Sequence, residues 1–214
     1  MTAPKMQVPR PGDRAMTAGI APPDHADCAA VWPSNTRIPT TPSRPHPAFW
    51  LMGCHGGAGV TTLEALLGPA GDSQRAWPAH AEQSPFVLLV AEESATGLEK
   101  AHLVLRQYHA GLAGRGNRLL GLVTVAPLPG RRPASIKQAR DLLSPLALNM
   151  WEVPFVAGYR ELLPGDLPMW SPGDPLPERK RRRDPRTDVP PEVADMGADL
   201  VDLVVSSYKQ ERSS

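Results

Sequence analysis

Cysteine, net charge and long apolar runs are scarce in this sequence of 214 residues. The two cysteines, Cys28 and Cys54, form neither a C-x-x-C motif nor a Cys/His ligand spacing, so nothing indicates a zinc site or a redox pair. No apolar run reaches the about 18 residues that a membrane span requires. The first residues include Pro4, Pro9 and Pro11 without the apolar core of a secretory signal. We therefore expect a soluble, reduced, cytoplasmic protein without a membrane span.

The charges nearly cancel, because 23 Lys and Arg residues stand against 22 Asp and Glu residues, a net charge of +1. No strong overall field then attracts the protein to nucleic acid or membrane, and any such attraction must come from a local patch. Proline and glycine are abundant instead, with 26 and 18 residues. This excess predicts that much of the chain is irregular and that its single core is small.

Proline is concentrated at both ends of the chain. Residues 1–47 hold ten prolines and few aliphatic side chains, a composition that cannot bury enough apolar surface to offset chain entropy, so we predict a disordered arm. Its Pro-rich pieces, such as residues 38–42, could dock as extended segments, or the arm could only solubilise the protein. Residues 171–190 are predicted to be a Pro-rich basic linker, and residues 191–208 an amphipathic C-terminal helix that docks on the domain.

Residues 48–170 alternate between apolar runs and helix signals. The apolar runs predict strands at residues 48–53, 86–91, 119–125 and 148–153. Helices are expected to begin near residues 61, 96 and 135, whereas residues 70–84 are expected to form a polar loop. The alternation predicts an α/β fold, a three-layer, mainly parallel sheet of about four or five strands with flanking helices. Ligands would then bind at the carboxyl ends of the strands.

One stretch, Phe49–Leu63, has the layout of a phosphate-binding P-loop: a short apolar strand, a glycine-rich loop and a helix start. The full pattern is G-x-x-x-x-G-K-[ST]. Cys54 and Gly59 take the two glycine positions. Val60 takes the position of the lysine, and Thr61 that of the hydroxyl residue. The chain therefore retains glycines whose backbone N–H groups could cradle phosphate, but lacks the lysine that would neutralise it.

The candidate anion loop follows from this alignment. Its residues are His55, Gly56, Gly57, Ala58, Gly59, Val60, Thr61 and Thr62. Its expected ligand is ATP or another nucleotide with Mg²⁺, and Thr61 is the candidate Mg²⁺ ligand. Because phosphoryl transfer depends on positioning and charge stabilisation, loss of the lysine predicts weak or absent binding and little hydrolysis. No catalytic residue is assigned.

The loop resembles that of the ParA and MinD class of P-loop ATPases, which reads K-G-G-x-G-K-T-T where this chain has H-G-G-A-G-V-T-T at 55–62. Residues 86–91 and 119–125 are similar to two later strands of that class, and W-E-V-P at 151–154 is similar to its closing motif. The likeness covers roughly residues 48–170. The chain also resembles an uncharacterised actinobacterial group of shortened P-loop-like proteins, often carried by integrating or conjugative elements. The resemblance implies a P-loop-like fold.

The sequence departs from the ParA and MinD pattern in ways that bear on activity. Both loop lysines are replaced, and Ala126-Pro127 stand where the class has Asn-Arg. The interval from Gly68 to Pro85 looks too short for the strand that carries the D-x-P-x-G switch. The resemblance therefore implies a non-hydrolysing or very weakly active interaction or regulatory module with a protein partner, in maintenance or transfer of a mobile element. The alternative is a divergent ATPase or GTPase completed by a cation from a partner or a loop arginine.

Two single residues and one pair of residues at or near the loop each allow two interpretations. A protonated His55 could replace the lysine, or it could make a structural hydrogen bond. Cys54 could be a thiolate at a helix start, or a small residue that lines the loop. The pair Glu92-Glu93 could bind Mg²⁺ or transfer a proton at the ligand edge, or could be solvated loop acids.

Basic residues suggest further anion sites. Four loop arginines could form one anion-binding face or could simply be exposed: Arg115, Arg118, Arg131 and Arg132. The clearest charged patch is the run Arg179, Lys180, Arg181, Arg182 and Arg183. It could bind DNA or RNA phosphates non-specifically, which makes a nucleic-acid-associated accessory factor a third hypothesis, or it could be a solvated linker neutralised by nearby acids. No recognition motif accompanies it.

Overall fold

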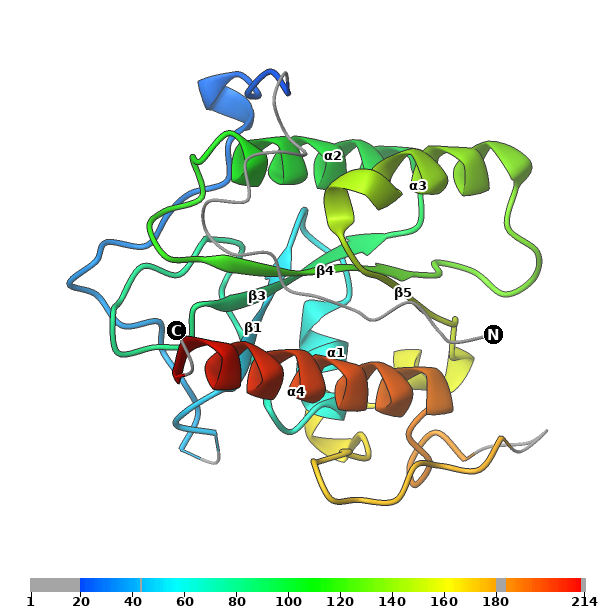
Figure 1. Cartoon of the computed structure of the whole chain (residues 1–214). Helices are drawn as coiled ribbons and strands as arrows, with labels where there is room; N and C mark the ends of the chain where they lie inside the picture. Colours follow the sequence, from blue (N-terminus) through cyan, green and yellow to red (C-terminus); the bar gives the residue numbers. More distant parts are fainter. Residues whose placement is uncertain (1–19, 43, 180–183, 213–214) are drawn as a thin grey trace.

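The computed structural model describes residues 20–42, 44–179 and 184–212, and its centre is a five-stranded sheet (Figure 1). All neighbouring strands are parallel, and their order is β2-β1-β3-β4-β5. The strands are β1 (Phe49–Gly53), β2 (Ala70–Asp72), β3 (Phe86–Glu92), β4 (Arg118–Val125) and β5 (Met150–Val153). This arrangement confirms the predicted parallel α/β fold. Because the strands are parallel, all their carboxyl ends lie at one edge of the sheet.

Four helices flank the sheet in two layers (Figure 1). They are α1 (Val60–Leu66), α2 (Ala95–His109), α3 (Ala134–Ala147) and α4 (Pro191–Arg212). Helices α1 and α4 cover one face, and α2 and α3 cover the other. Short 3₁₀ turns occur at His25–Asp27, Ala157–Arg160 and Pro164–Asp166. Within the described ranges, no helix is both long and apolar enough to cross a bilayer.

The central strand β3 shows why a continuous apolar run predicts a strand in such a sheet. Successive side chains of a strand point to opposite faces, and both faces here are covered by helices. Phe86, Leu88 and Val90 belong to the core on the α1 and α4 side, while Val87 and Leu89 belong to the core on the α2 and α3 side. All five side chains are fully buried.

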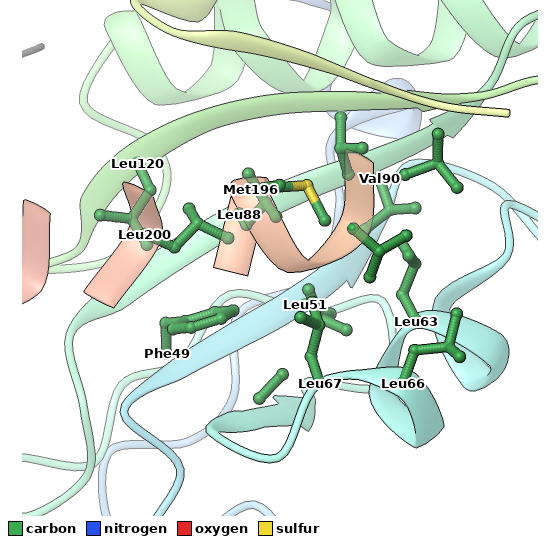
Figure 2. Packing of buried hydrophobic residues seen from close by; sticks show 14 of the residues in the cluster. Phe49, Leu51, Leu63, Leu66, Leu67, Leu88, Val90, Leu120, Met196 and Leu200 are labelled. Atoms are coloured by element: carbon green, nitrogen blue, oxygen red, sulfur yellow. The ribbon is translucent and has the colours of Figure 1, made fainter. Parts of the chain in front are cut away.

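Helix α4 closes the first of these two cores (Figure 2). Met196 and Leu200 lie over the sheet beside Leu88 and Leu120, with α1 nearby (Figure 2). Gly197 lets Trp170 approach, because a Cβ there would lie 2.5 Å from the Trp170 ring. The apolar spacing of the C-terminal segment therefore corresponds to a helix face buried on the sheet.

Strand β2 was missed by the sequence reasoning, which placed a polar loop at residues 70–84. Three residues are too few to show an alternating pattern, and one of them is Gly71, a poor strand former. Gly71 is required by close packing, since a Cβ there would lie 2.6 Å from Pro47 Cγ. The Gly68–Pro85 interval, inferred to be too short for the strand that carries the D-x-P-x-G switch, therefore does hold a short strand beside β1. The strand reads A-G-D, however, and a D-x-P-x-G sequence does not follow it.

The expectation of a disordered arm does not hold for residues 20–42 and 44–47. Trp32 N–H donates to Trp77 O, and Trp77 N–H donates to Ala30 O, both at 2.9 Å. The side-chain amide of Gln107 on α2 accepts from Ala29 N–H and donates to Ala29 O, both at 2.8 Å. The segment thus attaches through paired backbone groups, which composition does not reveal. Residues 1–19 lie outside the described residues.

Some helix boundaries also differ from the sequence signals. Helix α2 is capped by Ser94, whose Oγ accepts from Gly97 N–H at 3.1 Å, and it therefore begins at Ala95, one residue before the expected start. Helix α3 continues through Pro145 to its end at Ala147. The described Pro-rich residues 171–179 and 184–190 contain turns but no helix or strand.

We predict that Leu200→Ala lowers the free energy of unfolding by about 2–5 kcal/mol, because the Leu200 side chain is fully buried and its removal leaves a cavity. The same change at Leu142, which is 71% exposed on α3, should cost less than about 0.5 kcal/mol. Urea unfolding followed by circular dichroism measures both. Equal losses for the two variants would contradict the assignment of α4 to the core.

Candidate functional site

The strand order reverses between β1 and β3, since β2 lies on one side of β1 and the later strands lie on the other. In open parallel sheets of this kind, ligands bind outside the carboxyl ends of the strands at such a reversal. The loop that leaves β1 at this point is the glycine loop, residues 54–59, and β3 ends beside it at Glu92. Fold topology and the sequence motif therefore indicate the same place.

The glycine loop has a backbone that only glycine adopts easily. Gly57 and Gly59 have φ values of 79° and 98°, in the left-handed region. Gly59 is the N-cap of α1 and offers no capping side chain, and the first α1 hydrogen bond runs from Leu63 N–H to Gly59 O. The four N–H groups from Gly59 to Thr62 thus have no acceptor within the helix. Among the described residues, no hydrogen-bond acceptor is seen for these four N–H groups, so they are available to an anion.

Val60, at the lysine position, turns toward the protein interior. Its Cγ2 lies 3.1 Å from the point that a Cβ on Gly53 would occupy, and its side chain packs against the core under α1 and α4. Thr61, one residue later, is exposed. Its role as a Mg²⁺ ligand stays a prediction.

The His55 ring lies between the loop after β1 and the end of β3. Its Nδ1 lies 2.9 Å from Gly56 O, and its Nε2 lies 3.0 Å from Glu92 N. Both ring nitrogens are therefore engaged by backbone groups, as the structural-hydrogen-bond interpretation expects. Neither is left to pair with a phosphate.

A strained turn follows β2 and faces the glycine loop. Gln74 and Arg75 have φ values of 56° and 61°, and Ala76 N–H donates to Ser73 O at 3.3 Å. Two successive positive φ values define a type I′ turn, which normally uses Gly, Asn or Asp. Two contacts hold it: Asp72 Oδ1 accepts from Gln74 N–H at 2.7 Å, and a tryptophan of the N-terminal segment donates its indole N–H to Ser73 O at 3.0 Å. Strain of this kind is concentrated at functional sites.

The turn places Arg75 beside the glycine loop. Arg75 Nη1 lies 3.9 Å from the point that a Cβ on Gly56 would occupy, and Arg75 Cγ lies 3.6 Å from the corresponding point on Gly53. The side chain is exposed, and it takes part in none of the ion pairs between the described residues. Sequence reasoning missed this cation, because it follows a strand that was not predicted.

Glu93 is not a solvated loop acid. Its side chain is only 4% exposed, and its Oε1 lies 2.6 Å from Arg132 Nε and 3.8 Å from Arg140 Nε. The 2.6 Å contact joins the Arg132 guanidinium and the Glu93 carboxyl group as an ion pair. Glu152 on β5 joins the same two arginines, each at 2.7 Å. We call these four residues the Glu93 network. Among the described residues, no cluster of three His, Cys, Asp or Glu side chains suits a metal ion.

The charges of the Glu93 network shift the pKa of Glu152. Partial burial acts to raise the pKa of its carboxyl group, but the hydrogen bond from Arg132 and the charges of Arg140, Arg132 and Lys137 outweigh it. The net result is a pKa below the ordinary value of 4.5. The pKa of Arg132 is raised, mainly by its hydrogen bond to Glu152. Both groups are therefore stabilised in their charged forms.

The four arginines proposed as one anion-binding face lie at opposite ends of strand β4. Arg118 begins β4, pairs with Glu211 and stands over the Phe86 ring. Arg115 lies in the loop before β4, whereas Arg131 and Arg132 follow its end. A strand of eight residues is about 25 Å long. The proposal of a single face is wrong for this reason.

The basic run is only partly described. Arg179 pairs with Asp195 through a 3.0 Å contact and is 73% exposed. Residues 180–183 lie outside the described residues. Nucleic-acid binding through this run stays a prediction.

Cys54 lines the loop from inside. Its N–H donates to Val90 O at 2.8 Å, and its side chain is buried. Burial raises the pKa of the Cys54 thiol to about 12, although the backbone hydrogen bond with Val90 acts in the opposite direction. Cys54 therefore stays a neutral thiol, which supports the small lining residue over the thiolate.

No family model, no curated protein and no solved structure is significantly similar to this chain. What the structure itself shows is a five-stranded parallel α/β sheet.

We expect iodoacetamide to alkylate Cys28 in the native protein at pH 8 and to leave Cys54 unmodified. With a pKa of about 12, only about one Cys54 thiol in ten thousand is ionised at that pH, and burial limits access further. Cys28 is partly exposed and serves as the internal comparison. Peptide mass spectrometry with and without urea gives the two rates. Equal native rates would refute the buried position of Cys54.

The lowered pKa of Glu152 predicts a pH-dependent contribution to stability. A carboxyl group whose pKa is lower in the folded state stabilises that state above its unfolded-state pKa, and the contribution is lost as pH falls through the folded-state value. Wild type should therefore exceed Glu152→Gln in free energy of unfolding at pH 7, and the difference should shrink below about pH 4.5. Urea titrations between pH 7 and pH 3 measure it. Glu161→Gln, at an exposed acid, is the control; a Glu152 difference independent of pH would contradict the charged network.

Proposed function

We propose that this chain is a degenerate P-loop-like module, related to the ParA and MinD class, that binds the phosphates of ATP or another nucleotide and does not hydrolyse them efficiently. It acts through interaction with a protein partner rather than through turnover. The resemblance to proteins of mobile elements suggests maintenance or transfer of such an element as its setting.

The observation that carries this proposal is the strained turn that directs Arg75 to the uncapped glycine loop. Backbone N–H groups at a helix start favour an anion, but the charge of a nucleotide phosphate also requires a cation. A guanidinium can form two parallel hydrogen bonds to phosphate oxygens. Arg75 therefore supplies, from a neighbouring strand end, the charge that Val60 does not supply.

Hydrolysis requires more than a held phosphate. A base or positioning group must orient the attacking water near the terminal phosphate. Two acids at the ends of β2 and β3 already have structural roles, because Glu93 lies among arginines and Asp72 accepts from the Gln74 backbone N–H. The arrangement thus favours binding over cleavage.

The alternative is a divergent ATPase or GTPase whose missing cation is Arg75 itself. The same Arg75 position favours it, because an arginine near the phosphates can also stabilise the transition state. The two proposals agree about binding and differ about turnover.

We predict that Arg75→Gln weakens binding of Mg²⁺ and ATP about tenfold or more, since it removes a charge-assisted contact. Isothermal titration calorimetry on the whole chain measures the dissociation constants. Arg212→Gln is the matched control, because Arg212 is an exposed arginine in the last turn of α4. Absence of binding at millimolar ATP, GTP and inorganic phosphate would refute the proposed module.

Phosphate release decides between the two proposals. No release above background from protein that binds ATP supports the non-hydrolysing module. Release at an ordinary ATPase rate that Arg75→Gln abolishes would instead establish the divergent enzyme.

A further inference from the structure

His55 connects the ends of strands β1 and β3. It follows β1 by two residues, and its ring reaches the end of β3 at Glu92. We propose that His55, as a neutral imidazole with its proton on Nδ1, is the positioning residue that holds the glycine loop in its anion-binding shape. This inference rests on the proposed function of the loop.

The hydrogen-bond partners determine the protonation of the ring. A backbone N–H can only donate, so the Glu92 N–H at 3.0 Å requires Nε2 of His55 to accept without a proton. A carbonyl can only accept, so Gly56 O at 2.9 Å requires a proton on Nδ1 of His55. One neutral tautomer satisfies both contacts. An imidazolium would direct its Nε2–H against the Glu92 N–H.

Helix α2 leaves room for the ring because it has a glycine at the point of closest approach. A Cβ on Gly97 would lie 2.2 Å from Glu92 O and 3.0 Å from His55 Nε2. The position of Gly97 is held by its N–H, which donates to Ser94 Oγ at 3.1 Å. The start of α2 therefore packs against His55 and limits where the imidazole can move.

A loop with three glycines needs such a fixed point. Glycine loses more backbone freedom on ordering than any other residue, and a flexible loop would lose that freedom when it binds an anion. Two hydrogen bonds tie the beginning of the loop to β3: Cys54 N–H to Val90 O, and Glu92 N–H to His55. Since the Gly56 carbonyl is also held by His55, the loop is shaped before a ligand arrives.

Two side chains then contribute separately to the glycine loop. Arg75 provides positive charge beside the loop, and His55 fixes the conformation of the loop backbone. His55 is therefore not the substitute for the missing lysine. Removing it should weaken anion binding by loosening the loop, with no loss of positive charge from the site.

The test compares wild type with His55→Ala and His55→Gln in the whole chain. Gln carries a carbonyl oxygen at about the distance of Nε2 from Cα, so it can still accept from the Glu92 N–H. We expect a ¹H–¹⁵N correlation spectrum of wild type to show the Nδ1–H tautomer. His55→Ala should speed hydrogen exchange of the Glu92 amide and weaken ATP binding, each about tenfold, and His55→Gln should restore part of both.

His46→Ala is the control, because His46 is exposed in the segment before β1 and should change neither quantity. An Nε2–H or doubly protonated ring, or unchanged Glu92 exchange in His55→Ala, would overturn the inference. Faster exchange with unchanged ATP affinity would remove the role of His55 in binding. If wild type binds no ATP, the proposed function fails, whereas the tautomer and the Glu92 exchange still decide whether His55 fixes the loop. A His55→Ala variant that does not fold leaves the decision to the tautomer and to His55→Gln.

Discussion

Parallel pairing of β1 with both β2 and β3 is the constraint on which the candidate site depends. It brings three chain segments to the same edge: the glycine loop after β1, the Arg75 turn after β2 and the end of β3. If one of these strands ran in the opposite direction, the segment that follows it would lie at the other end of the sheet. The two covered faces of the sheet make this pairing stable, because helices on both sides bury the apolar strands.

The site is supported from places that look unrelated in the sequence. The N-terminal segment contributes Trp32, whose indole N–H holds the carbonyl of Ser73 in the strained turn. Helix α2 contributes Gly97, whose missing side chain admits His55. The strained conformation of Arg75 persists because the two residues before it, Ser73 and Gln74, are held by hydrogen bonds. In the proposed function, Arg75 supplies the positive charge at the glycine loop, because Val60 stands at the position where a P-loop has lysine.

At the same end of the sheet, the Glu93 network joins the ends of β3 and β5 to the segment after β4 and to α3. Buried ion pairs are costly to break, since removal of one partner leaves a charge without compensation. The network therefore stabilises the carboxyl end of the sheet by linking separate segments through ion pairs. It also explains why Glu93 is not the solvated acid that the sequence allowed: arginines distant in sequence enclose it.

Apolar runs and helical spacing in the sequence determined the parallel α/β class, four of the five strands and the buried face of α4, because these depend on burial of apolar side chains. A local motif determined the glycine loop. Only the tertiary structure decided the rest. Strand β2 was too short to show a pattern, and residues 20–42 and 44–47 attach through backbone pairing that composition does not encode. The positions of Arg75 and Glu93, and the hydrogen bonds of His55, depend on neighbours tens of residues away, since contacts across a parallel sheet join segments that local sequence cannot relate.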